Sequence, residues 1–310
     1  MISTIFGKTK PINYIILLVF LFGFYWFVHL VMFQRTYVLE QLLGHLVILG
    51  CLMFSIFLVN FITRRNKITG SNSLSILFYT LLIVVFPEVL LDSNAIFCSF
   101  FILLAVRRLL SLRSLKNIKL KIFDATLWIM VSSLFYDWAI MYLLLVFVAI
   151  YFYQPKNIRN WIVPFVAIFT MFIIMMATLA LINNPYYLLD HYNFKLDISS
   201  DYFTDIGVGS YLFFYILIVF LSGFIGYIKL GNVGLGKLVS MRLVLYLFLI
   251  GLAVYFLKSS SDNHPILITF FPAVVFTASY VESIKRDRIK ELVLLAIIML
   301  PFIVLLTRIF

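Results

Sequence analysis

Long apolar runs, separated by short polar or charged breaks, make up most of this chain. A bilayer core of about 30 Å is crossed by roughly 20 helical residues, so runs of this length predict membrane-spanning helices. The breaks divide the chain into eleven predicted spans, at about 12–33, 39–62, 73–91, 94–110, 122–136, 138–153, 161–182, 209–229, 243–257, 265–282 and 291–307.

The division within residues 122–153 is the least obvious, because only Tyr136, Asp137 and Trp138 interrupt this run. It can be one long tilted helix or a hairpin of two short helices. Lysine and arginine flank it on both sides, at 116–121 and 156–159. Because cytoplasmic loops accumulate these residues, both ends are expected inside, which favours the hairpin with Asp137 at its outer tip.

Composition and charge agree with a membrane protein. Of 310 residues, 64% are hydrophobic and 12% charged, the mean hydropathy is +1.10 and the net charge is +11. With the N-terminus cytoplasmic, 20 basic residues fall inside and four outside, whereas nine acidic residues fall outside and four inside. The positive charge therefore reflects insertion and does not indicate nucleic-acid binding.

This distribution predicts an all-α polytopic membrane protein with the C-terminus outside, that is, periplasmic in a bacterial inner membrane, and with residues 1–310 forming a single transmembrane domain. The first span is expected to remain uncleaved. The longest segment between spans, 183–208, is acidic and aromatic and is expected outside. The basic connector 107–121 is expected inside, where it anchors the topology or attracts anionic lipid.

Several segments between the spans have distinctive sequences: FGKTKPINY (6–14), VNFITRRNKITGSNS (59–73), FPEVLLDSNAI (86–96), LLSLRSLKNIKLKIFDATLW (109–128) and YQPKNIRNW (153–161). They resemble those of an uncharacterised family of polytopic inner-membrane proteins from flavobacteria. The resemblance covers the whole chain and implies no established activity, although some relatives carry a carotenoid-cleavage assignment.

A looser resemblance is architectural. The acidic outer turn, the basic inner connector, the short hairpin and the late outer loop before a proline-bearing helix together resemble membrane-embedded glycosyltransferases that use lipid-linked sugars. The resemblance implies an outward-facing carboxylate and a polyprenyl-phosphate-linked substrate.

Three carboxylates near the outer ends of spans are candidate catalytic residues. Glu88 and Asp92 lie one turn apart if their helix continues, so they can share a proton, bind a cation or assist sugar transfer. Asp137, at the tip of a short hairpin, is expected below the membrane surface in a water-filled cavity. The simpler interpretation is that Glu88 and Asp92 are interfacial residues at a helix end and that Asp137 only caps the turn between the interfacial residues Tyr136 and Trp138.

The outer loop KSSSDNHP (258–265) precedes a helix and combines a cation, hydroxyls, an acid and an imidazole. Asp262 and His264 are a candidate acid–base pair, and Lys258 is a candidate phosphate-binding residue, as is Arg35 in the first outer loop. Alternatively, the loop only caps the next helix.

Histidine and cysteine provide little evidence for a metal centre. Cys51 and Cys98 lie in apolar runs and are expected to be packing residues. An iron-dependent carotenoid-cleaving oxygenase needs several histidine ligands. The chain has four histidines, of which no two are separated by one helical turn: His29, His45, His191 and His264. No metal or cofactor is assigned.

Three functional hypotheses follow. The first is a glycosyltransferase-like enzyme that acts at the periplasmic face on a polyprenyl-phosphate-linked substrate. The second is a transporter or a non-catalytic subunit of an envelope complex, with a membrane-protein partner. The third, and least favoured, is the iron oxygenase. The enzyme hypothesis requires Glu88, Asp92, Asp137, Asp262 and His264 to converge on one outward cavity.

Overall fold

The computed structural model describes residues 5–184, 186–194, 206–229, 235–258 and 264–309, and within these ranges it contains helices and no strand. Each of the eleven predicted spans coincides with a helix or with two consecutive helices. Their bounds are α2 (Pro11–Phe27) with η1 (Val28–Met32), α3 (Leu39–Arg65), α4 (Leu74–Val85) with η2 (Pro87–Leu90), α5 (Ser93–Leu110) with η3 (Ser111–Ser114), α6 (Ile118–Ser132), η4 (Asp137–Tyr142) with α7 (Leu143–Tyr153), α8 (Ile158–Ile182), α11 (Ile206–Lys229), α12 (Leu235–Lys258), η6 (Pro265–Thr269) with α13 (Phe270–Glu282), and α14 (Asp287–Ile309).

Eight of these helical segments are long and apolar enough to cross a membrane, which establishes a multi-pass membrane protein by length and composition. The remaining segments, α4, α6 and the η4–α7 pair, are shorter. One further short helix, α9 (Tyr187–His191), lies in the segment between α8 and α11.

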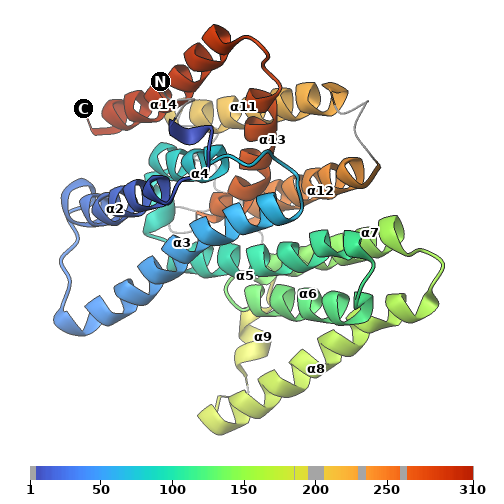
Figure 1. The fold of residues 1–310 in the computed structure, drawn as a ribbon. Helices are drawn as coiled ribbons and strands as arrows, with labels where there is room; N and C mark the ends of the chain where they lie inside the picture. Colours follow the sequence, from blue (N-terminus) through green and yellow to red (C-terminus); the bar gives the residue numbers. More distant parts are fainter. Residues whose placement is uncertain (1–4, 185, 195–205, 230–234, 259–263, 310) are drawn as a thin grey trace.

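The helices form a bundle in which α4 and α13 are central (Figure 1). Eleven of the 12 residues of α4 are buried, and 78% of the α13 segment is buried, against 17% in α8 and in α14. The peripheral helices α8 and α14 therefore expose mostly apolar side chains. In an aqueous protein such faces would be aggregation-prone, whereas lipid accommodates them.

Residues 118–153 form two helices rather than one long helix. Helix α6 ends at Ser132, the chain turns at residues 133–136, and η4 with α7 returns beside α6 (Figure 1). Ser132 and Ser133 donate to backbone carbonyls three residues back, at 2.7 and 2.8 Å. Such local bonds compete with helix continuation and accompany the end of α6.

Candidate functional site

The connector between α4 and α5, residues 86–92, is the element that organises the polar residues near the predicted outer ends of the helices. Helix α4 ends at Val85, and Pro87, two residues later, has no backbone N–H, so the chain leaves the α-helix and forms the short 3-10 helix η2. Asp92 then caps α5 by accepting a hydrogen bond from the backbone N–H of Ala95, at 3.0 Å. The helix expected to place Glu88 one turn from Asp92 is thus interrupted between them.

Asp92 is buried and accepts two further hydrogen bonds from distant parts of the chain. One comes from the Tyr136 hydroxyl, at the tip of the α6–α7 hairpin, and the other from the backbone N–H of His264, at 2.7 Å. We call Asp92, Tyr136, Asp137, Lys258 and His264 the Asp92 cluster. Burial and the neighbouring Asp92 carboxylate raise the pKa of Tyr136 well above its ordinary value, so the phenol remains a hydrogen-bond donor.

Asp137 follows Tyr136 at the hairpin tip and pairs with Lys258 at the end of α12. The distance between the Lys258 Nζ and the Asp137 Oδ1 is 3.7 Å, and the two side chains are 20% and 4% exposed. Asp137 Oδ1 also accepts from the backbone N–H of Trp138 at 2.9 Å. The pair brings together a candidate catalytic residue and a candidate phosphate-binding residue that lie far apart in sequence.

The segment that includes α9 covers the hairpin tip. The Tyr192 and Ser133 hydroxyls are hydrogen-bonded at 2.8 Å, and His191 Nε2 donates to the Ser133 carbonyl at 2.8 Å. The rings of Phe194 and Trp138 meet edge-to-face, with their centroids 5.3 Å apart. Helix α9 has no buried residue, and besides these contacts it is attached to the bundle by Leu188, which packs against the apolar cluster of Met130, Met171 and Met175.

A second group of residues lies on the other side of the connector, and we call Tyr25, His29, Tyr37 and His45 the His29 cluster. His29 is buried in the π-helical turn η1, where its Nε2 donates to the Leu90 carbonyl at 3.1 Å and its Nδ1 accepts from the Tyr37 hydroxyl. Tyr25 and His45 are hydrogen-bonded at 2.7 Å. π-Helical turns are rare and occur frequently at functional sites.

Of the two remaining charged candidates, Arg35 lies with the His29 cluster, whereas the side chain of Glu88 pairs with a residue that belongs to neither cluster. Arg35 is exposed, and its backbone N–H donates to the His29 carbonyl at 2.9 Å. Glu88 forms an ion pair with Arg308 of α14, and the Arg308 guanidinium stacks over the Tyr211 ring, 4.9 Å from its centroid.

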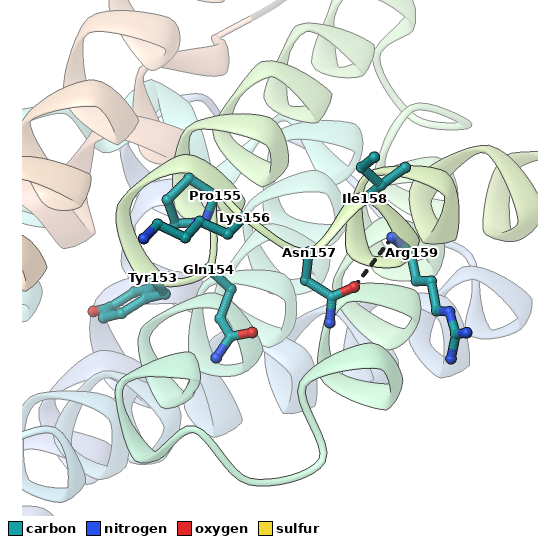
Figure 2. Close-up of a pocket in the computed structure, with 7 residues that line it drawn as sticks. All are labelled: Tyr153, Gln154, Pro155, Lys156, Asn157, Ile158 and Arg159. Atoms are coloured by element: carbon teal, nitrogen blue, oxygen red, sulfur yellow. Dashed lines mark hydrogen bonds between the residues drawn. The ribbon is translucent and has the colours of Figure 1, made fainter.

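The predicted convergence on one outward cavity is therefore only partly observed. Asp92, Asp137, Lys258 and the backbone of His264 come together, Glu88 and Arg35 belong to other sets of contacts, and Asp262 lies outside the described residues. A hollow of about 560 Å³ lies at the α7–α8 turn (Figure 2), and none of the candidate residues lines it.

Metal binding finds no support in the described part of the chain, where no three His, Cys, Asp or Glu side chains are grouped to hold an ion. The histidines lie at three places: His29 and His45 in contact, with ring centroids 5.2 Å apart, His191 against the hairpin, and His264 before η6.

Sequence reasoning missed the tyrosines of both clusters. Tyr136 was recognisable only by its position beside Asp137, whereas Tyr25 and Tyr37 lacked any local signal.

The sequence matches no known family model, no curated protein and no solved structure.

Proposed function

We propose that all eleven helical segments cross or line the membrane, with the N-terminus inside and the C-terminus outside. Three contacts support the outer assignments: Glu88 with Arg308, Asp92 with the His264 backbone, and Asp137 with Lys258. Each joins two residues that the charge distribution places outside. An error of one span between the partners would put them on opposite sides.

Contacts among the predicted inner segments support the same arrangement. The Glu282 carboxylate accepts from the Gly70 backbone N–H at 2.8 Å and from the Asn72 side chain at 2.5 Å, and Arg113 donates to the Asn66 carbonyl at 3.3 Å. These contacts join α13 and the 107–121 connector to the turn between α3 and α4, all of which are predicted inside.

For the biochemical role, we propose that the protein is a membrane-embedded enzyme that acts at the outer face on a lipid-linked, phosphate-bearing substrate, with glycosyl transfer as the reaction. The observation that carries this proposal is the pair of the buried Asp137 and the partly exposed Lys258. A cation that solvent can still reach, beside a buried carboxylate, provides a phosphate-binding group next to a general base.

In this proposal Lys258 binds the phosphate of the polyprenyl carrier and stabilises it as the leaving group. Asp137, released from Lys258 when the phosphate binds, accepts the proton of the attacking hydroxyl. Asp92 holds Tyr136, and with it the hairpin tip, in place. Helix α9, which has no buried residue, covers the tip and must move to admit substrate, as lids do in many enzymes.

The test compares membranes that lack the protein with membranes that contain wild type, Asp137→Asn or Lys258→Gln. Asp137→Asn is expected to retain the carrier lipid on purification and to accumulate the lipid-linked sugar, because transfer is blocked after binding. Lys258→Gln is expected to retain about tenfold less carrier lipid, measured by mass spectrometry in mild detergent.

Asp287→Asn, which neutralises an exposed carboxylate at the start of α14, is the matched control and should behave as wild type. Unchanged retained lipids and unchanged lipid-linked sugars in a folded Asp137→Asn protein would exclude this role.

The same pair supports a second candidate, proton-coupled transport, because an ionisable pair within a membrane protein marks proton and ion pathways in many transporters. Proteoliposomes that contain a pH-sensitive dye separate the two functions. Substrate-driven proton entry that Asp137→Asn abolishes, without any lipid-linked product, would favour transport.

A further inference from the structure

We propose that the α7–α8 turn is a binding site for an anionic glycerophospholipid, with the headgroup phosphate over the turn and the acyl chains along α8. The site is separate from the Asp92 cluster, so the inference does not depend on the enzyme proposal. It rests on three features of the turn: a hollow, two cations without an acidic neighbour, and an apolar stripe that leads away from it.

The hollow, of about 560 Å³, is formed by the seven consecutive residues from Tyr153 to Arg159. Lys156 and Arg159 extend to opposite sides of the turn, and the side chains of Gln154 and Asn157 lie between them (Figure 2). A phosphate placed over the turn is therefore attracted by a cation on either side.

The polar groups of the turn are arranged as donors. Asn157 Oδ1 caps α8 by accepting from the Arg159 backbone N–H at 3.2 Å, and Gln154 Oε1 accepts from Asn160 at 3.5 Å. Each amide thus uses its oxygen within the protein, which leaves its nitrogen to donate. Two amide donors and two cations suit a phosphodiester, which only accepts hydrogen bonds.

No acidic side chain competes for these cations. The chain contains neither Asp nor Glu between Asp137 and Asp190, and within the described residues no ion pair involves Lys156 or Arg159. Positive segments at the cytoplasmic face attract anionic lipids.

An apolar stripe continues from the turn along α8. Ile158, Ile162, Phe165 and Phe169 lie on one face of the helix and are each more than half exposed. At the start of the stripe the Trp161 indole N–H donates to the Pro155 carbonyl at 3.1 Å, an arrangement that suits an interfacial tryptophan. A lipid with its phosphate at the turn thus has a surface for its chains.

Trp161 also provides the reporter for the test. The full chain is reconstituted into vesicles with brominated chains on either phosphatidylglycerol or phosphatidylcholine, and bromine quenches tryptophan at close range. The part of the quenching that is seen in wild type and is absent in the Trp161→Phe variant is assigned to Trp161. We expect phosphatidylglycerol to be selected over phosphatidylcholine by tenfold or more, since each cation near the surface contributes about fivefold.

The double variant Lys156→Gln/Arg159→Gln should reduce this selectivity to near one. The matched control is Lys116→Gln/Lys119→Gln, which removes the same charge from exposed positions on the basic connector and should keep the selectivity. Circular dichroism verifies that both variants fold.

Three results would overturn the proposal. Equal loss of selectivity in both double variants means that surface potential alone attracts the lipid. Displacement of the lipid by millimolar glycerol 3-phosphate means that the turn binds a soluble phosphate. No quenching of Trp161 by either lipid means that something other than lipid covers the face of α8.

Discussion

Replacing Asp92 by alanine is expected to destabilise the protein more than any other single carboxylate change discussed above. Asp92 accepts from Ala95, from the His264 backbone and from the Tyr136 hydroxyl. Loss of an N-cap costs about 1 kcal/mol, and each buried hydrogen bond to a charged group contributes about 2 kcal/mol. Because such terms are not additive, we expect a total loss of about 4 kcal/mol.

The assay is the apparent melting temperature in one detergent at a fixed scan rate, followed by circular dichroism. At roughly 2 °C per kcal/mol, Asp92→Ala should melt about 8 °C below wild type. Asp92→Asn keeps the cap, but its amide N–H group would face the His264 backbone N–H, which is also a donor. We therefore expect its melting temperature to fall by about half as much as that of Asp92→Ala. Tyr136→Phe removes one bond and should cost about 1–2 kcal/mol.

Asp190→Ala is the control, because Asp190 is exposed on α9, and it should melt within about 1 °C of wild type. If Asp92→Ala also melted within that margin, the three hydrogen bonds would not stabilise the fold, and the account of Asp92 as the junction between α5, the hairpin and η6 would be refuted.

Two further predictions concern packing and topology. Gly251→Ala should destabilise the protein by about 1–3 kcal/mol, because the added Cβ would lie 2.8 Å from the Tyr142 hydroxyl oxygen. Gly44→Ala is the control and should be neutral or stabilising, because its added Cβ would have no atom within 4 Å. Thermal melting of the two variants tests both expectations. In intact cells, Leu39→Cys should react with a membrane-impermeant maleimide and Leu115→Cys should react only after lysis, in a background without the native cysteines. Reaction of both before lysis would contradict the proposed topology.

The helices could be predicted from the sequence because hydropathy is a local property. Every predicted span coincides with observed helix, and the charge flanking residues 122–153 favoured the hairpin that the structure contains. The helix ends were harder to predict from the sequence. Helix α8 begins three residues before its predicted start at 161, and α12 begins eight residues before its predicted start at 243. The added residues include the charged side chains of Arg159, Lys237 and Arg242, which lie outside the apolar windows.

The site was only partly predictable, because its contacts join distant segments. The carboxylates and Lys258 stood out as charges near apolar runs, but nothing local indicated that Asp137 meets Lys258 whereas Glu88 meets Arg308. The His29 cluster was missed for the same reason. No two histidines are one helical turn apart in the sequence, yet His29 and His45 approach each other from two helices.

The burial of α4 has a consequence for how this protein is made. Helix α4 packs against α13 and α14, which leave the ribosome roughly 200 residues later. In the proposed topology, α4 therefore stays in the membrane beside α2 and α3 until α13 and α14 are made, with the surface for these late partners facing lipid or the insertion machinery. Its lack of any charged side chain permits this, because no ion has to be shielded until the last helices arrive.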